Sequence, residues 1–121
     1  MRTLLGLIML MHGFAHLVGF AGACKLSGQM PYKTSVFAGH VNLGAAAMRA
    51  LGLVWALVAL AFAIAGAAAI TNRTWWIPAA LGVAAASLIL TLVETPDARI
   101  GALVNVFIMG AVLGGQRTHW F

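Results

Sequence analysis

Residues 51–70, LGLVWALVALAFAIAGAAAI, decide the fold class, because the whole stretch is apolar and carries no charged side chain. A helix of about 20 residues, rising about 1.5 Å per residue, crosses the roughly 30 Å hydrocarbon core of a bilayer. The rest of the chain has the same character, since 63% of its 121 residues are hydrophobic and only 7% are charged. A soluble domain carries about 25% charged residues and disorder requires low hydrophobicity, so the sequence predicts an integral membrane protein.

Three further stretches, residues 4–23, 75–93 and 96–115, are long and apolar enough to span a membrane. The connections between the last three spans, residues 71–74 and 94–95, are short, so consecutive spans should be antiparallel neighbours. We therefore predict an all-α, four-helix up-down bundle that forms a single transmembrane domain over the whole chain. Thr95 is expected to cap the fourth helix, with Pro96 at its first position.

The one long connection runs from Cys24 to about Ala50. Its second half, residues 35–48, is mildly apolar and alanine-rich, which suits an interfacial helix or a re-entrant loop. The run before Cys24 resembles a signal-peptide cleavage site, but it is longer than the usual run of about 7–15 apolar residues. We expect it to stay as a span, with Cys24 as a free thiol at its end.

The seven Lys and Arg residues give a net charge of +5 but are spread singly at the ends of the apolar stretches. Nucleic-acid binding requires a clustered basic patch, so no nucleic-acid partner is expected, and the bilayer itself is the partner that this pattern indicates. With four spans the cations divide almost evenly between the two sides, and the weak preference is for cytoplasmic termini. On the side of the termini, three residues are predicted to anchor in the headgroups: Trp75, Trp76 and Trp120.

Small residues at four-residue spacing predict where helices approach closely in a membrane. The rows are Ala61, Ala65 and Ala69 in the second span and Gly110 and Gly114 in the fourth. They suit either packing within the bundle or a specific face for an oligomer. Two mid-membrane polar residues, Asn105 and Ser87, are expected to hydrogen-bond between helices.

His12 and His16 are the most distinctive residues of the sequence, because they lie four residues apart near the middle of the first span and therefore share a helix face. Ionisable residues inside a membrane indicate function by default, and an imidazole at this depth is expected to be neutral. Three interpretations stay open: hydrogen bonding inside the bundle, contact with a quinone, haem or chlorophyll-type pigment, and proton relay. No grouping of residues predicts a metal site built from protein ligands alone.

A second polar group is predicted on the side opposite the termini. It consists of His40, Arg49, Glu94 and Arg99, and Glu94 is positioned in sequence to pair with Arg99. The spans contain no acid, which argues against a proton-coupled transporter. No nucleophile, base and acid stand together either, so no catalytic residue is assigned and no catalytic activity is expected.

Three stretches also carry a resemblance: MHGFAHLVGF at residues 11–20, PYKT at 31–34 and PDARIG at 96–101. They resemble a group of small bacterial four-span membrane proteins, broadly similar to the DoxX-like proteins and sometimes labelled permeases. That group often has arginine at the position of His40 and an acid nearby, whereas this chain has NLGA at residues 42–45. The resemblance implies a bacterial inner membrane and a link to quinone or membrane redox chemistry.

Three functions are consistent with these observations. The first is an accessory or scaffold subunit of a larger membrane assembly, respiratory or photosynthetic, with protein partners or further copies of the chain. The second is a redox component of DoxX-like type that binds a quinone or tetrapyrrole through His12 and His16. The third is a small oligomeric transporter or channel.

Overall fold

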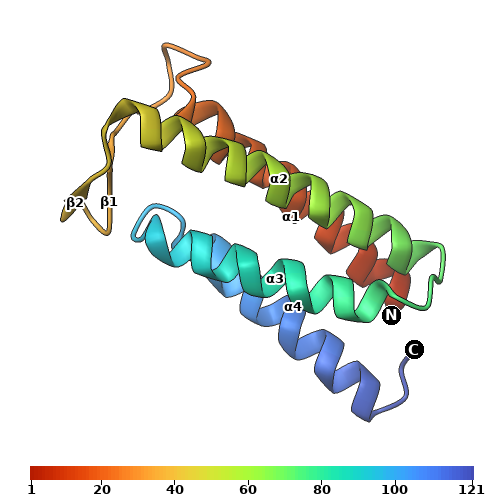
Figure 1. The fold of residues 1–121 in the computed structure, drawn as a ribbon. Coiled ribbons are helices and arrows are strands. Elements are labelled where there is room, and N and C mark those ends of the chain that lie inside the picture. Colours follow the sequence, from red (N-terminus) through yellow and green to blue (C-terminus); the bar gives the residue numbers. More distant parts are fainter.

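The computed structural model describes residues 1–121 as four helices and one short β-hairpin (Figure 1). In chain order the elements are α1 (Arg2–Ala23), β1 (Ser35–Val36), β2 (Val41–Asn42), α2 (Gly44–Ile70), α3 (Trp76–Val93) and α4 (Arg99–Arg117). Each helix is long and apolar enough to cross a membrane. The all-α four-helix fold is confirmed, and these helices support a multi-pass membrane protein.

The helices form two layers, with α1 and α2 in one and α3 and α4 in the other (Figure 1). Helix α1 packs mainly on α2, and α3 packs mainly on α4. The layers meet chiefly through α2 and α3, whereas α1 and α4 touch at few points. Both termini lie at one end of the bundle and the hairpin lies at the other.

Helices α1 and α2 approach closely because glycines face each other along their contact. A Cβ atom on Gly66 would lie 2.8 Å from the carbonyl oxygen of Gly6, and one on Gly13 would lie 2.8 Å from Cβ of Phe62. Lipid provides no hydrophobic force between helices, so such backbone contact supplies the packing energy. The glycines therefore make α1 and α2 the tightest pair.

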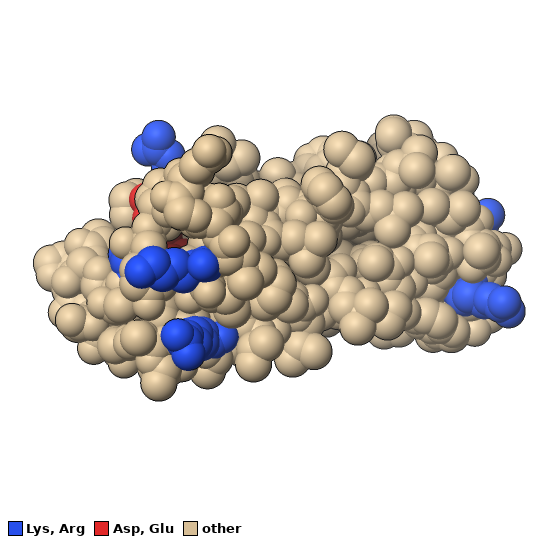
Figure 2. Space-filling view, turned by 90° about the horizontal axis from the view of Figure 1, so that it is seen from above, with Lys and Arg blue, Asp and Glu red and all other residues tan.

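Apolar side chains lie on both the inside and the outside of the bundle. Met9, Phe62 and Ile108 are fully buried, whereas Met11 and Phe14 expose more than 70% of their surface. Lysine and arginine side chains lie at the two ends of the molecule and leave an uncharged band between them (Figure 2). This is the surface that a bilayer requires, with an apolar belt between two charged ends.

Two helix starts differ from the sequence-based boundaries. Helix α2 begins at Gly44, seven residues earlier than expected, because an alanine-rich stretch continues the helix outward. The expected interfacial helix or re-entrant loop at residues 35–48 is therefore wrong: β1 and β2 pair antiparallel there, Ser35 opposite Asn42. Helix α4 begins at Arg99 without a side-chain cap, and the Thr95 hydroxyl donates to the carbonyl of Thr91 instead (3.2 Å).

We call residues 24–43 the strap, because they run from the end of α1 across to the α3–α4 turn (residues 94–98). The amide of Phe37 donates to the carbonyl of Val93, and that of Ala38 donates to the carbonyl of Thr95, both at 2.9 Å. The strap therefore joins the two layers at the hairpin end. Cys24, at the start of the strap, forms no disulfide.

The predicted packing residues divide between inside and outside. Ala65 and Ala69 are buried and Ala61 is partly buried. Gly110 and Gly114 are exposed, with no atom within 4 Å of where a Cβ would stand, so of the two alternatives for this row the packing inside the bundle is wrong. The reason is that α4 turns this face away from α3.

The predicted tryptophan anchors divide in the same way. Trp75 and Trp120 are exposed at the end where the termini lie. Trp76 is buried and packs edge-on against Phe121, with 4.9 Å between ring centroids. Its prediction as an anchor is therefore wrong, because the C-terminal residue folds back over the indole ring.

Candidate functional site

A cavity of about 590 Å³ lies between α1 and α4, at the seam where these helices make few contacts. Trp55 and Met48 of α2 form its inner wall, and strap residues with the α3–α4 turn line its end. The α1 lining runs from His12 to Ala23, a rise of about 16 Å along the helix. Ligand pockets usually measure about 300–1,000 Å³, so this cavity is large enough for a small organic ring molecule.

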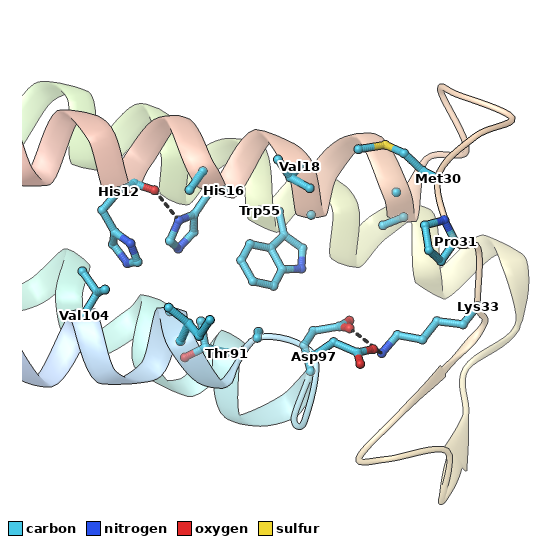
Figure 3. A pocket seen from close by; sticks show the side chains of 18 of the residues that line it. His12, His16, Val18, Met30, Pro31, Lys33, Trp55, Thr91, Asp97 and Val104 are labelled. Atoms are coloured by element: carbon cyan, nitrogen blue, oxygen red, sulfur yellow. Dashed lines mark hydrogen bonds and ion pairs between the residues drawn. The ribbon is translucent and has the colours of Figure 1, made fainter.

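The two histidines form the deep end of the cavity. Their rings point from α1 into the space between the layers, and Trp55 follows toward the strap (Figure 3). The histidine rings meet edge to face at 4.6 Å between centroids, and the Trp55 ring lies 5.0 Å from that of His16. Gly101 of α4 stands next to His12 and Thr91, since a Cβ there would lie 3.8 Å from Cε1 of His12 and 3.0 Å from Cγ2 of Thr91. The lining at this depth is therefore aromatic and uncharged.

A buried hydrogen-bond network joins the two layers behind this lining. Nε2 of His12 lies 3.0 Å from Oδ1 of Asn105, and Nδ1 of His16 lies 2.8 Å from the His12 carbonyl oxygen. The Ser87 hydroxyl lies 2.6 Å from Nε2 of His16 and accepts from the Asn105 amide at 2.8 Å. The network thus connects α1, α3 and α4, and the predicted interhelical bonding of Asn105 and Ser87 is confirmed.

The acceptors in this network fix where each proton sits on the uncharged rings. The His12 carbonyl oxygen only accepts, so Nδ1 of His16 carries the hydrogen and Nε2 of that ring accepts from the Ser87 hydroxyl. Ser87 then accepts from the Asn105 amide, which leaves Oδ1 of Asn105 to accept from Nε2–H of His12. A neutral imidazole carries one hydrogen, so Nδ1 of His12 keeps a lone pair.

That lone pair has no partner within the chain. The fully buried side-chain polar atoms without a partner are Nε of Arg2 and Oε1 of Glu94. Nδ1 of His12 is not one of these fully buried atoms, and His12 lines the cavity. His16, in contrast, uses both ring nitrogens inside the protein. Of the two histidines, His12 is therefore the one with a ring nitrogen that is not bonded within the chain.

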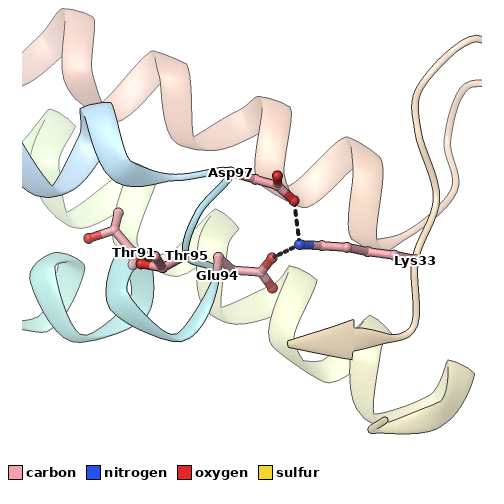
Figure 4. A network of polar contacts seen from close by, with 5 residues as sticks. All are labelled: Lys33, Thr91, Glu94, Thr95 and Asp97. Atoms are coloured by element: carbon pink, nitrogen blue, oxygen red, sulfur yellow. Dashed lines mark hydrogen bonds and ion pairs between the residues drawn. The ribbon is translucent and has the colours of Figure 1, made fainter. Parts of the chain in front are cut away.

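The strap end of the cavity is charged. Nζ of Lys33 lies 2.5 Å from Oδ2 of Asp97 and 3.2 Å from Oε2 of Glu94 (Figure 4). Burial lowers the pKa of Lys33, but the hydrogen bonds and charges of Asp97 and Glu94 outweigh it and raise that pKa above its ordinary value. Glu94 is 6% exposed, and its Oε1 has no hydrogen-bond partner. A buried acceptor without a partner is costly, so Glu94 is held at an energetic cost that its pairing with Lys33 offsets in part.

The structure corrects the predicted polar group on this side. His40, Arg49 and Arg99 are exposed and form no ion pair, and Glu94 pairs with Lys33 instead of Arg99. The short turn holds Arg99 at the first position of α4, directed outward. Asp97 completes the group, although no pattern in the sequence predicted a role for it in a site.

Two lining residues, Trp55 and Thr91, carry no sequence signal of their own, because an aromatic or a threonine within a span is ordinary. The sequence feature that could have indicated a role for Lys33 was the pair of acids, which lie three residues apart in one turn and need a cation partner. Four cations lie on that side, and only the tertiary path of the strap selects one of them.

The rim along the bundle differs from the charged end. Val18 of α1 and Ile100 of α4 line the cavity and are 58% and 72% exposed. Both lie within membrane-spanning helices. The cavity is therefore bordered by apolar side chains along the α1–α4 seam and by charged ones at the strap.

The site offers little to a metal or tetrapyrrole. No group of three or more His, Cys, Asp or Glu side chains is placed to hold a metal ion. Three of the four ring nitrogens of His12 and His16 already bond within the protein. Axial ligation of a haem or pigment would have to displace one of these bonds or use the remaining nitrogen alone.

No protein-family model, curated protein or solved structure matches the chain. The resemblance to DoxX-like proteins stays a prediction. The functional argument therefore rests on the geometry of the cavity.

Proposed function

We propose that this protein binds one lipid-soluble ring molecule of the quinone class in the cavity between α1 and α4. The observation that supports it is the cavity itself, which passes from a charged end at Lys33 and Glu94 to an aromatic, uncharged interior at Trp55 and His12. Binding sites for small molecules are mostly apolar with a few placed polar groups, and this lining has that composition.

The apolar rim supports the same class of ligand. Val18 and Ile100 border the cavity where acyl chains would surround the helices, so a ligand dissolved in lipid reaches it without crossing water. A quinone has a polar ring for the interior and an apolar substituent for the seam. Neither feature suits a hydrophilic metabolite or an inorganic ion.

A short-chain benzoquinone, titrated into the detergent-purified protein, tests the proposal through tryptophan fluorescence. Trp55 is the tryptophan that lines the cavity, so bound quinone should quench part of the emission in a saturable way. Val104→Phe fills the cavity, and Val106→Phe places the same ring on the exposed face of α4. Saturable quenching should persist in Val106→Phe and be lost in Val104→Phe. The proposal would be overturned if quenching of the unaltered protein did not saturate, or if the two variants bound the quinone equally well.

A second candidate function is an accessory subunit of a larger membrane assembly. The exposed Gly110 and Gly114 favour it, because glycines at this spacing form close helix contacts with a partner. Native gel migration after gentle solubilisation tests it. Gly114→Leu should release the chain from a larger species, and migration of the unaltered protein as a lone chain would exclude the candidate.

A further inference from the structure

We infer that the indole N–H of Trp55 recognises the ligand by donating a hydrogen bond to an oxygen on its ring. This inference rests on the proposed function and adds the residue that sets the specificity of the same site. The ligand must then carry an acceptor oxygen, and a hydrocarbon ring of the same shape binds more weakly. A quinone carbonyl and the hydroxyl oxygen of its reduced form both accept, so the requirement covers either redox state.

Trp55 is a buried donor without a partner. The residue is only 7% exposed, and its Nε1 takes part in no hydrogen bond within the chain. A buried tryptophan N–H usually has a partner, so this one is unusual. The unpartnered polar atoms that are fully buried belong to Arg2 and Glu94, and Nε1 of Trp55 is not among them. A ligand in the cavity that Trp55 lines can therefore reach this N–H.

The packing of the indole ring fixes the direction of its N–H. Trp55 projects from α2 into the space between the layers, and its nitrogen lies on the edge of the ring that faces the strap (Figure 3). The ring packs on the backbone of α1 at Gly19, where a Cβ would lie only 2.6 Å from Cδ2 of the indole. His16 lies on the deep side of the ring, with 5.0 Å between centroids. The donor is thus held pointing along the cavity toward its strap end.

The other polar side chains that line the cavity from the helices have no hydrogen left to donate. The uncharged rings of His12 and His16 carry one hydrogen each, and both are used inside the protein. The Thr91 hydroxyl donates to a carbonyl of its own helix at 2.9 Å. Lys33 of the strap keeps a third N–H, but its side chain is 36% exposed, so water competes for that hydrogen. Trp55 is therefore the one unused donor that the membrane-spanning helices offer to the cavity.

An unpaired buried donor makes the site sensitive to the chemistry of the ligand. Leaving such a donor without a partner costs free energy, and an acceptor oxygen in the cavity removes that cost. A site of this kind rejects an analogue that lacks the bonding group, because its own polar atom then stays unpaired. Removing the indole N–H should weaken the binding of an oxygen-bearing ring about tenfold, which corresponds to about 1.4 kcal/mol.

Titration calorimetry in detergent micelles tests the inference with duroquinone and durene, which share a methylated six-carbon ring and differ in the carbonyl oxygens. Each probe is measured with the unaltered protein, with Trp55→Phe and with the control Trp75→Phe, whose exposed ring lies outside the cavity. Comparing one probe between proteins cancels its partitioning into the micelle. Duroquinone should bind about tenfold more weakly to Trp55→Phe, whereas durene should bind all three proteins alike and Trp75→Phe should change neither probe.

An equal loss for both probes in Trp55→Phe would mean that the indole contributes only its shape, which would overturn the inference and leave the proposed function standing. No saturable binding of duroquinone by the unaltered protein would overturn both. Infrared difference spectra need no variant, because a hydrogen bond weakens the C=O bond of the ligand. The carbonyl stretching band of duroquinone should therefore move to lower frequency on binding. A band that stays at its frequency in protein-free micelles would overturn the inference even if Trp55→Phe does not fold.

Discussion

Ser87 has the most demanding position among the buried polar residues. Its hydroxyl donates to Nε2 of His16 and accepts from the Asn105 amide, so one oxygen completes the bonding of two neighbours. It also fixes the proton order that leaves the His12 lone pair free. A residue with a single small hydroxyl therefore holds in place a histidine that lines the cavity, although Ser87 itself does not line it.

Ser87→Ala should destabilise the protein by about 1–2 kcal/mol, because both neighbours lose a buried partner in a region without water. The measurement is chemical unfolding in detergent micelles, followed by circular dichroism. Ser35→Ala is the matched control, since Ser35 forms no side-chain hydrogen bond in the strap hairpin. Equal stability of Ser87→Ala and the control would show that the network contributes nothing.

The histidine pair also shows which features of the site can be predicted from the sequence and which cannot. Their shared face and their depth follow from a four-residue spacing within one apolar stretch. Their partners are 71 and 93 residues away, and no spacing rule connects positions on different helices. Sequence reasoning could therefore nominate Ser87 and Asn105 as polar groups but could not pair them.

Helices α1 and α2 differ from α4 in what their glycines do. Gly6 and Gly66 bring two backbones together, whereas Gly110 and Gly114 face outward. The glycines at four-residue spacing are the exposed pair, whereas Gly6 and Gly66 have large residues four positions away, so the spacing alone does not tell a packed face from an exposed one. Which side of α4 meets α3 depends on the turn before it.

Gly66→Ala should destabilise the α1–α2 pair by about 1–3 kcal/mol, the usual cost of overpacking. The new Cβ would lie 2.8 Å from the Gly6 carbonyl oxygen and 3.0 Å from Cγ of Leu10, and backbone does not yield easily. Gly110→Ala is the control, because its Cβ would stand in open space and alanine favours helix. Unfolding in micelles should separate the two variants, and a comparable loss in both would contradict this assignment.

The helix ends show why the boundaries were less predictable than the spans. Apolar length predicts a crossing helix, but it does not say where the helix continues into the interface, as α2 does from Gly44. The hairpin at Ser35–Asn42 was missed because its stability comes from bonds to the α3–α4 turn, more than 50 residues away. Secondary-structure propensity depends on neighbouring residues in the chain, so it does not predict such long-range bonds.

The molecule as a whole is two helix pairs held together at the hairpin end by the strap. Backbone bonds from Phe37 and Ala38 and the ion pairs of Lys33 all cross from the strap to the α3–α4 turn. The α1–α4 seam beside this junction holds the cavity. Anything that loosens the strap therefore changes the end of the cavity as well.

Lys33→Gln should lower the stability by about 1 kcal/mol at neutral pH, the upper end for a partly exposed ion pair. The raised pKa of Lys33 means that its contribution is complete below the ordinary value of 10.5 and is lost as the pH rises through the raised value. The difference in melting temperature between the unaltered protein and the variant should thus be constant near neutrality and shrink above pH 10.5. Arg49→Gln, which removes an exposed cation without an ion pair, should show no such trend. A pH-independent difference would contradict the assignment.

The apolar rim at Val18 and Ile100 has a consequence for how occupancy should be counted. A ligand that enters from the bilayer is concentrated there by partitioning, so its relevant amount is moles per mole of lipid. Adding empty vesicles at constant total ligand should then deplete the site by dilution in two dimensions, although the aqueous volume is unchanged. A dissociation constant quoted in molar units would describe the membrane preparation as much as the protein.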